Sequence, residues 1–327
     1  MRPPAFWDAE AGHPAARFLA PLGALYGRHT AARMDRPGAT APCPVLCIGN
    51  FGLGGAGKTP TALAVAALLR DLGAHPAFLT RGYGGRLSGP LRVEPGRHRA
   101  HETGDEPLLL ARVAPTILAR DRPAGARLCV ARGADVIVMD DGLQNPSLTK
   151  NLSLAVVDAG AGLGNGRPFP AGPLRVPLAR QWPHVHGLVV IGAGARGEAV
   201  AEMARRRGCP VHRARLVPGA DLAGRRVLAF AGIGRPEKFF ASLREAGAEV
   251  VATRAFADHH PYGARDTAGL ADEAARRGLD LVTTAKDHVR LEPAFAACVS
   301  VLPVALRFAE EAALLAQLRA LLALRSG

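Results

Sequence analysis

Aromatic residues are scarce in this chain, at 5% of its 327 residues. Proteins that track nucleic acid usually interleave aromatic and basic side chains in their binding loops, so the scarcity argues against nucleic acid as a partner. Cysteine is also sparse, and its spacing shows neither a C-x-x-C pair nor a metal-ligand pattern: Cys43, Cys47, Cys129, Cys209 and Cys298. These features indicate reduced thiols in a cytoplasmic protein, without a disulfide framework or a zinc site.

Long apolar runs are missing as well. None approaches the roughly 20 residues needed to span a bilayer, and the N-terminus lacks the continuous apolar core of a signal peptide. We therefore expect no transmembrane helix. Residues 13–30 nevertheless carry apolar side chains at helical spacing, flanked by Arg17 and Arg28 and interrupted by Pro21: Phe18, Leu19, Leu22, Leu25 and Tyr26. Such a helix either lies on an anionic membrane surface or packs on the protein, and periodicity alone favours packing.

The charge is strongly one-sided, with a formal net charge of +13 that comes almost entirely from arginine. A basic excess favours anionic partners such as nucleic acid, acidic lipid or a phosphorylated substrate. Arginine is spread along the whole chain, however, so a general compositional preference for this residue explains the charge about as well.

Residues 49–69, GNFGLGGAGKTPTALAVAALL, contain the strongest motif of the chain. Residues 52–59 satisfy the phosphate-loop pattern G-x-x-x-x-G-K-[ST] between an apolar strand-like run and an Ala/Leu-rich helix. Backbone N–H groups of such a loop and the following helix N-terminus cradle phosphate. Lys58 is expected to reach the β- and γ-phosphates, and the Thr59 hydroxyl to bind Mg²⁺. The predicted nucleotide-binding residues are Gly52, Gly54, Gly55, Ala56, Gly57, Lys58 and Thr59.

A second signal is VIVMDDG, an apolar run that ends in Asp140 and Asp141. Acids at the carboxyl end of a strand beside a phosphate loop bind Mg²⁺ directly or through water. An acid pair after a strand often only caps a turn, but the upstream loop favours the metal site. The sequence does not distinguish which aspartate is the ligand.

Two polar stretches carry further acids and histidines. TGDEP places Asp105 and Glu106 before a helix, where acids often act only as caps. FADHHPY places Asp258, His259 and His260 between a strand and a helix. A carboxylate from the first stretch and a histidine from the second could meet across a cleft and deprotonate an alcohol for attack on the γ-phosphate.

Strand-like and helix-like segments alternate along the chain, which predicts an α/β protein with a mostly parallel sheet and helices on both faces. We predict a phosphate-loop (P-loop) domain over 1–160, a Gly/Pro-rich linker over 161–184 and a second, smaller α/β domain over 185–327. The last helix has leucines on one face and could pack back on the first domain.

Several classes of P-loop protein fit poorly. A GTPase needs an [NT]-K-x-D motif, whereas in TTAKD Lys286 and Asp287 are adjacent. Partition-type ATPases carry a second lysine near the start of the loop, where this chain has Leu53. A kinase for a small or lipidic alcohol remains, and the alternative is a nucleotide-dependent switch or metal-insertion chaperone.

Eight blocks occur in order between residues 49 and 291: GNFGLGGAGKTP, TRGYGG, TGDEP, MDDGLQ, NGRPFPAGPLR, AFAGIGRPEKFF, ADHH and TTAKDHVRL. Together they closely resemble the tetraacyldisaccharide 4'-kinase family, the lipid A 4'-kinases of Gram-negative bacteria. The resemblance implies transfer of the ATP γ-phosphate, with Mg²⁺, to the 4'-hydroxyl of tetraacyldisaccharide 1-phosphate, a lipid A precursor, giving lipid IV(A). It also implies a peripheral protein on the anionic cytoplasmic face of the inner membrane, anchored by residues 13–30. We expect a monomer.

The resemblance also implies roles for single residues. The fold it implies is a P-loop domain and a second α/β domain joined by a two-stranded linker, with the active site between them. Lys58 takes part in catalysis, Asp105 is the expected base and His259 its support. The expected metal-site residues are Thr59, Glu106, Asp140 and Asp141, with Gln144 shaping that site. The expected substrate-binding residues are Gln144, Asn145, Asn165 and Arg175.

Three positions depart from the family pattern. Ala56 stands where the loop often has threonine, at a position that contributes mainly backbone. Asn145 stands where histidine commonly follows DDGLQ, so a proton-transfer role there is not expected. Ala285 replaces a glutamate in TTAKD, which removes one ion pair.

Overall fold

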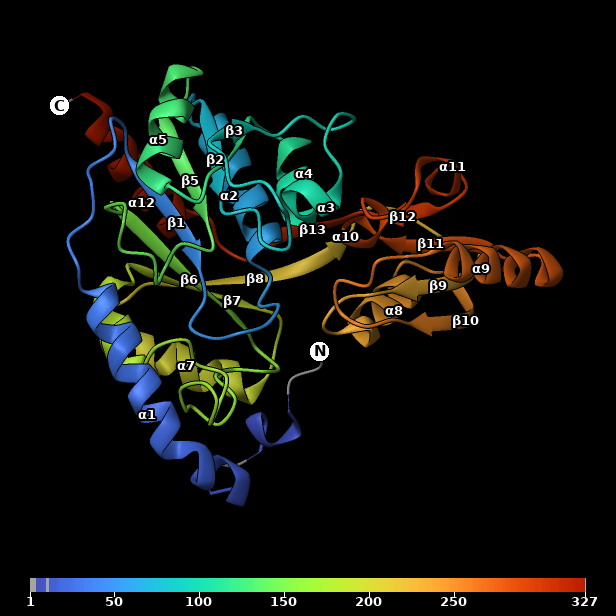
Figure 1. Cartoon of the computed structure of the whole chain (residues 1–327), viewed down its shortest axis with the longest axis horizontal. Coiled ribbons are helices and arrows are strands. Elements are labelled where there is room, and N and C mark those ends of the chain that lie inside the picture. Colours follow the sequence, from blue (N-terminus) through green and yellow to red (C-terminus); the bar gives the residue numbers. More distant parts are fainter. Residues whose placement is uncertain (1–3, 10–11, 327) are drawn as a thin grey trace.

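The described part of the chain forms two β-sheets in the computed structural model, a large one of nine strands and a small one of four, and Figure 1 shows how they are arranged. The structure describes residues 4–9 and 12–326; residues 1–3, 10–11 and 327, which the predicted domain ranges include, lie outside the described residues. The order in the large sheet is β13-β8-β7-β6-β1-β5-β2-β4-β3. Its strands are β1 (Val45–Gly49), β2 (Pro76–Thr80), β3 (Leu91–Arg92), β4 (Thr116–Leu118), β5 (Val136–Asp140), β6 (Leu152–Asp158), β7 (Gly187–Ile191), β8 (Val211–Pro218) and β13 (Val304–Phe308).

Neighbouring strands of the large sheet are parallel except for the edge pairs β13·β8 and β3·β4. Side chains alternate between its two faces because successive residues of a strand point to opposite sides. In β1, Val45 and Cys47 join the core beneath α1 (Pro14–Met34), α5 (Arg122–Ala131) and α7 (Ala195–Arg205). Leu46 and Ile48 join the opposite core beneath α2 (Lys58–Asp71) and α12 (Ala312–Ala323). The predicted mostly parallel sheet with helices on both faces is therefore confirmed.

The small sheet has the order β10-β9-β11-β12 and is fully parallel. Its strands are β9 (Arg226–Ala231), β10 (Glu249–Ala255), β11 (Asp280–Thr284) and β12 (Ser300–Leu302). Phe239 and Phe240 of α8 (Pro236–Glu245) cover one face, and Leu270 of α9 (Ala264–Arg277) covers the other. Short helices α10 (Ala285–His288) and α11 (Pro293–Ala296) complete this second α/β unit.

The predicted boundary of the second domain at residue 185 is wrong. Strands β7 and β8, within the range assigned to that domain, pair in the large sheet, as does β13 near the C-terminus. The second domain therefore covers 219–303 and is inserted between β8 and β13, which run antiparallel and lead to it as two adjacent strands (Figure 1). Helix α12 packs on the large sheet through Leu314, Leu318 and Leu321.

The predicted linker at 161–184 is also wrong, because this stretch packs against the first domain. Ala171, Leu174 and Val176 are buried there, and Leu174 bridges to Gly52 of the P-loop. The stretch ends in α6 (Leu178–Gln181) and the 3-10 turn η2 (Trp182–His184). Its glycines and prolines shape a compact loop over the core instead of joining two domains.

The remaining helices are short. They are η1 (Ala5–Trp7), α3 (Ala100–Thr103), α4 (Asp105–Ala111) and η3 (Leu324–Ser326). Helix α4 faces the second domain, since α10 contacts it. A second contact between the domains joins Asp158, at the end of β6, to Arg235 at 3.0 Å and to Lys238. The domains therefore meet beyond the carboxyl ends of the large sheet's strands, where α/β proteins bind ligands.

Candidate active site

The P-loop connects β1 to α2 and begins that helix at Lys58. Gly57 precedes it with φ +90°, a left-handed conformation in which a Cβ atom would also lie 2.5 Å from the Ile191 side chain. Only glycine fits there without strain. The Lys58 ammonium group lies 3.4 Å from Asn50 Oδ1 and 3.7 Å from Asp141 Oδ1. The predicted loop is thus formed, with its lysine at the carboxyl edge of β1.

Asp140 ends β5, the strand beside β1. Its side chain is 1% exposed, and Oδ1 has no hydrogen-bond partner among the described residues. Burial raises the pKa of Asp140 to about 7, helped by the nearby charges of Glu106 and Asp141 and opposed by Lys58 and Arg122. A buried carboxylate oxygen without a donor is costly unless a cation or proton satisfies it.

Asp141 is satisfied differently. Arg175 binds its two oxygens in a fork at 2.8 and 2.9 Å. Burial raises the pKa of Asp141, but Lys58 and Arg175 outweigh it and keep the pKa below its usual value. The two acids at the end of β5 therefore have separate environments: Asp141 is neutralised by protein cations and Asp140 is not.

These environments fit a Mg²⁺ site built around Asp140. Mg²⁺ usually takes one or two protein carboxylates and completes its shell with water and substrate phosphates. Among the described residues no group of three or more His, Cys, Asp or Glu side chains could hold a metal ion by itself. Glu106, another acid of the predicted metal site, places Oε1 3.3 Å from the Lys286 ammonium group.

The structure brings Asp105 and His259 together across the two domains. Asp105 begins α4, and its side chain is 3% exposed. His259 follows β10, is 35% exposed and places Nδ1 3.3 Å from Asp105 Oδ2. Asp105 Oδ1 accepts the backbone N–H of Glu106 at 3.0 Å, so the buried acid points at the histidine through its other oxygen.

Two cations that the sequence reasoning did not single out complete this cluster. Arg290 donates Nε to Asp105 Oδ2 at 3.0 Å and also donates Nη2 to it, and Lys286 lies 4.0 Å away. Burial raises the pKa of Asp105, but the hydrogen bond from His259 and the charges of Lys286 and Arg290 hold it well below its usual range. Both cations lie in the TTAKDHVRL block, one of the eight blocks that carry the family resemblance, but no role in the site was predicted for its charged residues.

The predicted substrate residues are engaged inside the protein. Gln144 donates Nε2 to Asn50 O at 2.6 Å and to Gln181 Oε1 at 2.8 Å, and Arg175 also binds Gly52 O at 3.1 Å. Both side chains therefore support the backbone at the start of the P-loop. Asn145 Oδ1 accepts Ser147 N at 2.8 Å, which forms a local turn.

Asn165 has a buried side chain. It donates to Ala171 O at 2.9 Å and to Phe6 O at 3.2 Å, and accepts from Arg167 N at 3.1 Å. Both ends of the amide therefore hold the surrounding loop in place, and the contact of Asn165 with the substrate stays a prediction.

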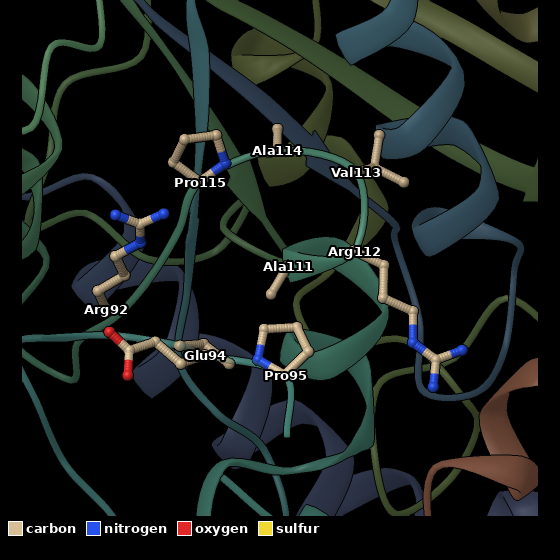
Figure 2. A pocket seen from close by; sticks show the side chains of 9 residues that line it. Arg92, Glu94, Pro95, Ala111, Arg112, Val113, Ala114 and Pro115 are labelled. Carbon is tan, nitrogen blue, oxygen red and sulfur yellow. The ribbon is translucent and has the colours of Figure 1, made fainter. Parts of the chain in front are cut away.

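A separate pocket of about 320 Å³ lies at the C-terminal end of α4, whereas Asp105 lies at the N-terminal end of this helix (Figure 2). Residues 92–95 and 111–115 line it, and Arg112 points outward from it in the figure. None of its lining residues belongs to the P-loop or to the Asp105–His259 pair. It is therefore distinct from the candidate active site.

Known proteins resemble this chain over nearly its whole length. The family described as tetraacyldisaccharide-1-P 4'-kinase matches residues 15–323. A tetraacyldisaccharide 4'-kinase of Methylorubrum populi is 70% identical over 98% of this chain and 99% of its own length. One of Rhodopseudomonas palustris is 55% identical over 90% and 88%. The crystal structure of "apo" form LpxK from Aquifex aeolicus in complex with ATP is 25% identical with a TM-score of 0.75, covering 94% of this chain and 99% of that one.

Proposed function

Because the chain belongs to the tetraacyldisaccharide-1-P 4'-kinase family, we propose that it transfers the γ-phosphate of ATP to the 4'-hydroxyl of tetraacyldisaccharide 1-phosphate, giving lipid IV(A). The observation that carries this proposal is the position of Asp105 and His259, which meet between the domains beside an intact P-loop. A P-loop alone would serve a switch protein equally well. A buried acid paired with a histidine supplies the proton acceptor that an alcohol substrate needs.

Lys58 and the backbone N–H groups of residues 54–59 would hold the ATP phosphates. Phosphoryl transfer depends mainly on alignment and charge compensation. The contacts of the Lys58 ammonium group with Asn50 and Asp141, at 3.4 and 3.7 Å, are long, so phosphate oxygens could replace them. Asp140 and the Thr59 hydroxyl are the residues that would hold Mg²⁺, with Glu106 nearby. When bound, Mg²⁺ offsets the negative charge of the phosphates.

The acceptor hydroxyl would lose its proton to the Asp105–His259 pair. Asp105 is buried and accepts from His259 and Arg290 on one oxygen, so His259 is the more accessible member. With Asp105 accepting from Nδ1, the imidazole carries its hydrogen there and leaves Nε2 as the acceptor atom. In this proposal the roles expected from the resemblance, Asp105 as the base and His259 as its support, are exchanged: Asp105 would orient the imidazole and stabilise its charged form.

We also propose that α1 lies on the membrane surface. Among the described residues no helix is long and apolar enough to cross a bilayer. Helix α1 packs on the 168–177 loop through Gly23 and Gly27, where a Cβ atom would lie 2.9 Å from Pro168 O and from Pro177 Cγ. Its opposite face exposes the large apolar side chains Phe18, Leu22 and Leu25, while the partly exposed Tyr26 also contacts Phe169 of this loop. Such a face, flanked by Arg17 and Arg28, suits the boundary of an anionic bilayer.

The test is transfer of labelled phosphate from γ-labelled ATP to tetraacyldisaccharide 1-phosphate in mixed micelles. We expect a labelled bis-phosphorylated lipid with the wild-type protein and a loss of at least about a hundredfold in Lys58→Ala. ATP turnover without labelled lipid would refute the proposed function and favour a nucleotide-dependent switch.

A further inference from the structure

Arg290 is buried between the two domains although it carries a charge. Its side chain is 7% exposed. It lies just after α10 in the second domain, yet it contacts Asp105 of the first domain through Nε at 3.0 Å and through Nη2. A buried arginine is stable only when its N–H groups are hydrogen-bonded and its charge is paired.

The rest of the guanidinium group is fixed by the second domain itself. Nη1 donates to Gly232 O at 2.9 Å and to Asp287 Oδ1 at 3.0 Å. Asp287 is fully buried and also accepts from Tyr262 Oη at 2.9 Å and from Thr284 Oγ1 at 2.6 Å. The Arg290 side chain is therefore held by a cluster of hydrogen-bonded polar groups and has little freedom to adopt another orientation.

This arrangement fixes the position of the Asp105 carboxylate. The side chain is 3% exposed, and Oδ2, the oxygen that Arg290 binds, lies 3.3 Å from His259 Nδ1. Without Arg290 this oxygen would lose the two N–H donors that hold it in place. Lys286 is a weaker substitute because it lies 4.0 Å from Asp105 and is nearer, at 3.3 Å, to Glu106.

We infer that Arg290 is a positioning residue for phosphoryl transfer: it holds Asp105 Oδ2 in place beside His259, so that the site is complete only when the second domain is docked. This inference rests on the proposed function and adds a residue and a role to it. Arg290 does not need to touch either substrate, since it acts through Asp105.

The test compares Arg290→Met and Arg290→Lys with a matched control, Arg225→Met. Arg225 also forms an ion pair in the second domain, with Asp280, and its other hydrogen bond goes to Ser300. We expect Arg290→Met to lower kcat by on the order of a hundredfold while KM for ATP changes less than about threefold. Arg290→Lys should recover part of kcat, and Arg225→Met should match the wild type.

A second readout does not depend on turnover. The infrared carboxylate band that is lost in Asp105→Asn should shift in Arg290→Met, because the carboxylate loses two hydrogen bonds, and should stay unchanged in Arg225→Met. Three results would overturn the inference: wild-type kcat in Arg290→Met, a loss of kcat that Arg290→Lys does not recover and that comes with a lower melting temperature, or an unshifted carboxylate band. Wild-type protein that makes no labelled lipid, while the band still shifts in Arg290→Met, would refute the proposed function and leave the Arg290–Asp105 contact standing.

Discussion

The outer face of α1 gives a quantitative test of membrane association. Phe18 is 83% exposed and Leu22 is 56% exposed, and both point away from the loop on which the helix packs. Replacing both by serine removes apolar surface without touching Gly23 or Gly27, which make the packing contact. The fold should therefore be preserved while the proposed lipid contact is lost.

The size of the effect follows from the exposed area. Full burial of a side chain of this size contributes about 2 kcal/mol, so the exposed parts of Phe18 and Leu22 together account for roughly 3 kcal/mol if they enter lipid. Since 1.4 kcal/mol is a factor of ten, the double variant should partition onto vesicles about a hundredfold more weakly.

The assay is co-sedimentation with vesicles of phosphatidylcholine and phosphatidylglycerol. The control variant is Met203→Ser/Leu324→Ser, which removes apolar side chains that are 38% and 54% exposed elsewhere on the surface. We expect the control to sediment like the wild type. If the α1 variant stays within a factor of about two of the wild type, or if the control loses as much, the membrane role of this face is wrong.

Two further predictions concern the chemistry of the site. Asp140→Asn should raise the Mg²⁺ concentration for half-maximal turnover by at least about tenfold. Because burial raises the pKa of the wild-type carboxyl to about 7, Mg²⁺ should bind the wild type more weakly as the pH falls below that value. Mg²⁺ titrations of turnover at several pH values should show this pH dependence in the wild type but not in the variant. Asp105→Asn and His259→Gln should each lower kcat by roughly 10²- to 10⁴-fold in the labelled-phosphate assay. The kcat of the double variant should be no lower than that of the less active single variant. Multiplicative losses in the double variant would contradict a shared proton path.

The parts of the molecule that sequence reasoning predicted are those formed by residues that follow one another in the chain. The P-loop needs a strand, glycines and a helix start in immediate succession, and residues 49–69 supply all three. Asp140 and Asp141 follow an apolar strand directly, so their place at the sheet edge also follows from local sequence.

The domain boundary could not be predicted in the same way. Strands β7 and β8 have the same apolar character as strands of either sheet, so their composition does not indicate to which sheet they belong. Pairing depends on the return of β13, about ninety residues after β8 along the chain, which only the folded topology shows. The Gly/Pro-rich composition of 161–184 predicted irregular backbone correctly but not its burial, because composition says nothing about tertiary contacts.

The geometry of the site depends on such distant contacts. Among the described residues, the non-glycine residues with positive φ are Asp141 at +50° and His259 at +60°. Such conformations cost free energy and persist where the surroundings impose them. Arg175 fixes Asp141 by its two-oxygen contact, and Asp105 holds His259 from the other domain. The motifs therefore identify which residues take part, whereas their orientation is set by partners far away in the sequence, of which Arg290, 185 residues from Asp105, is the clearest case.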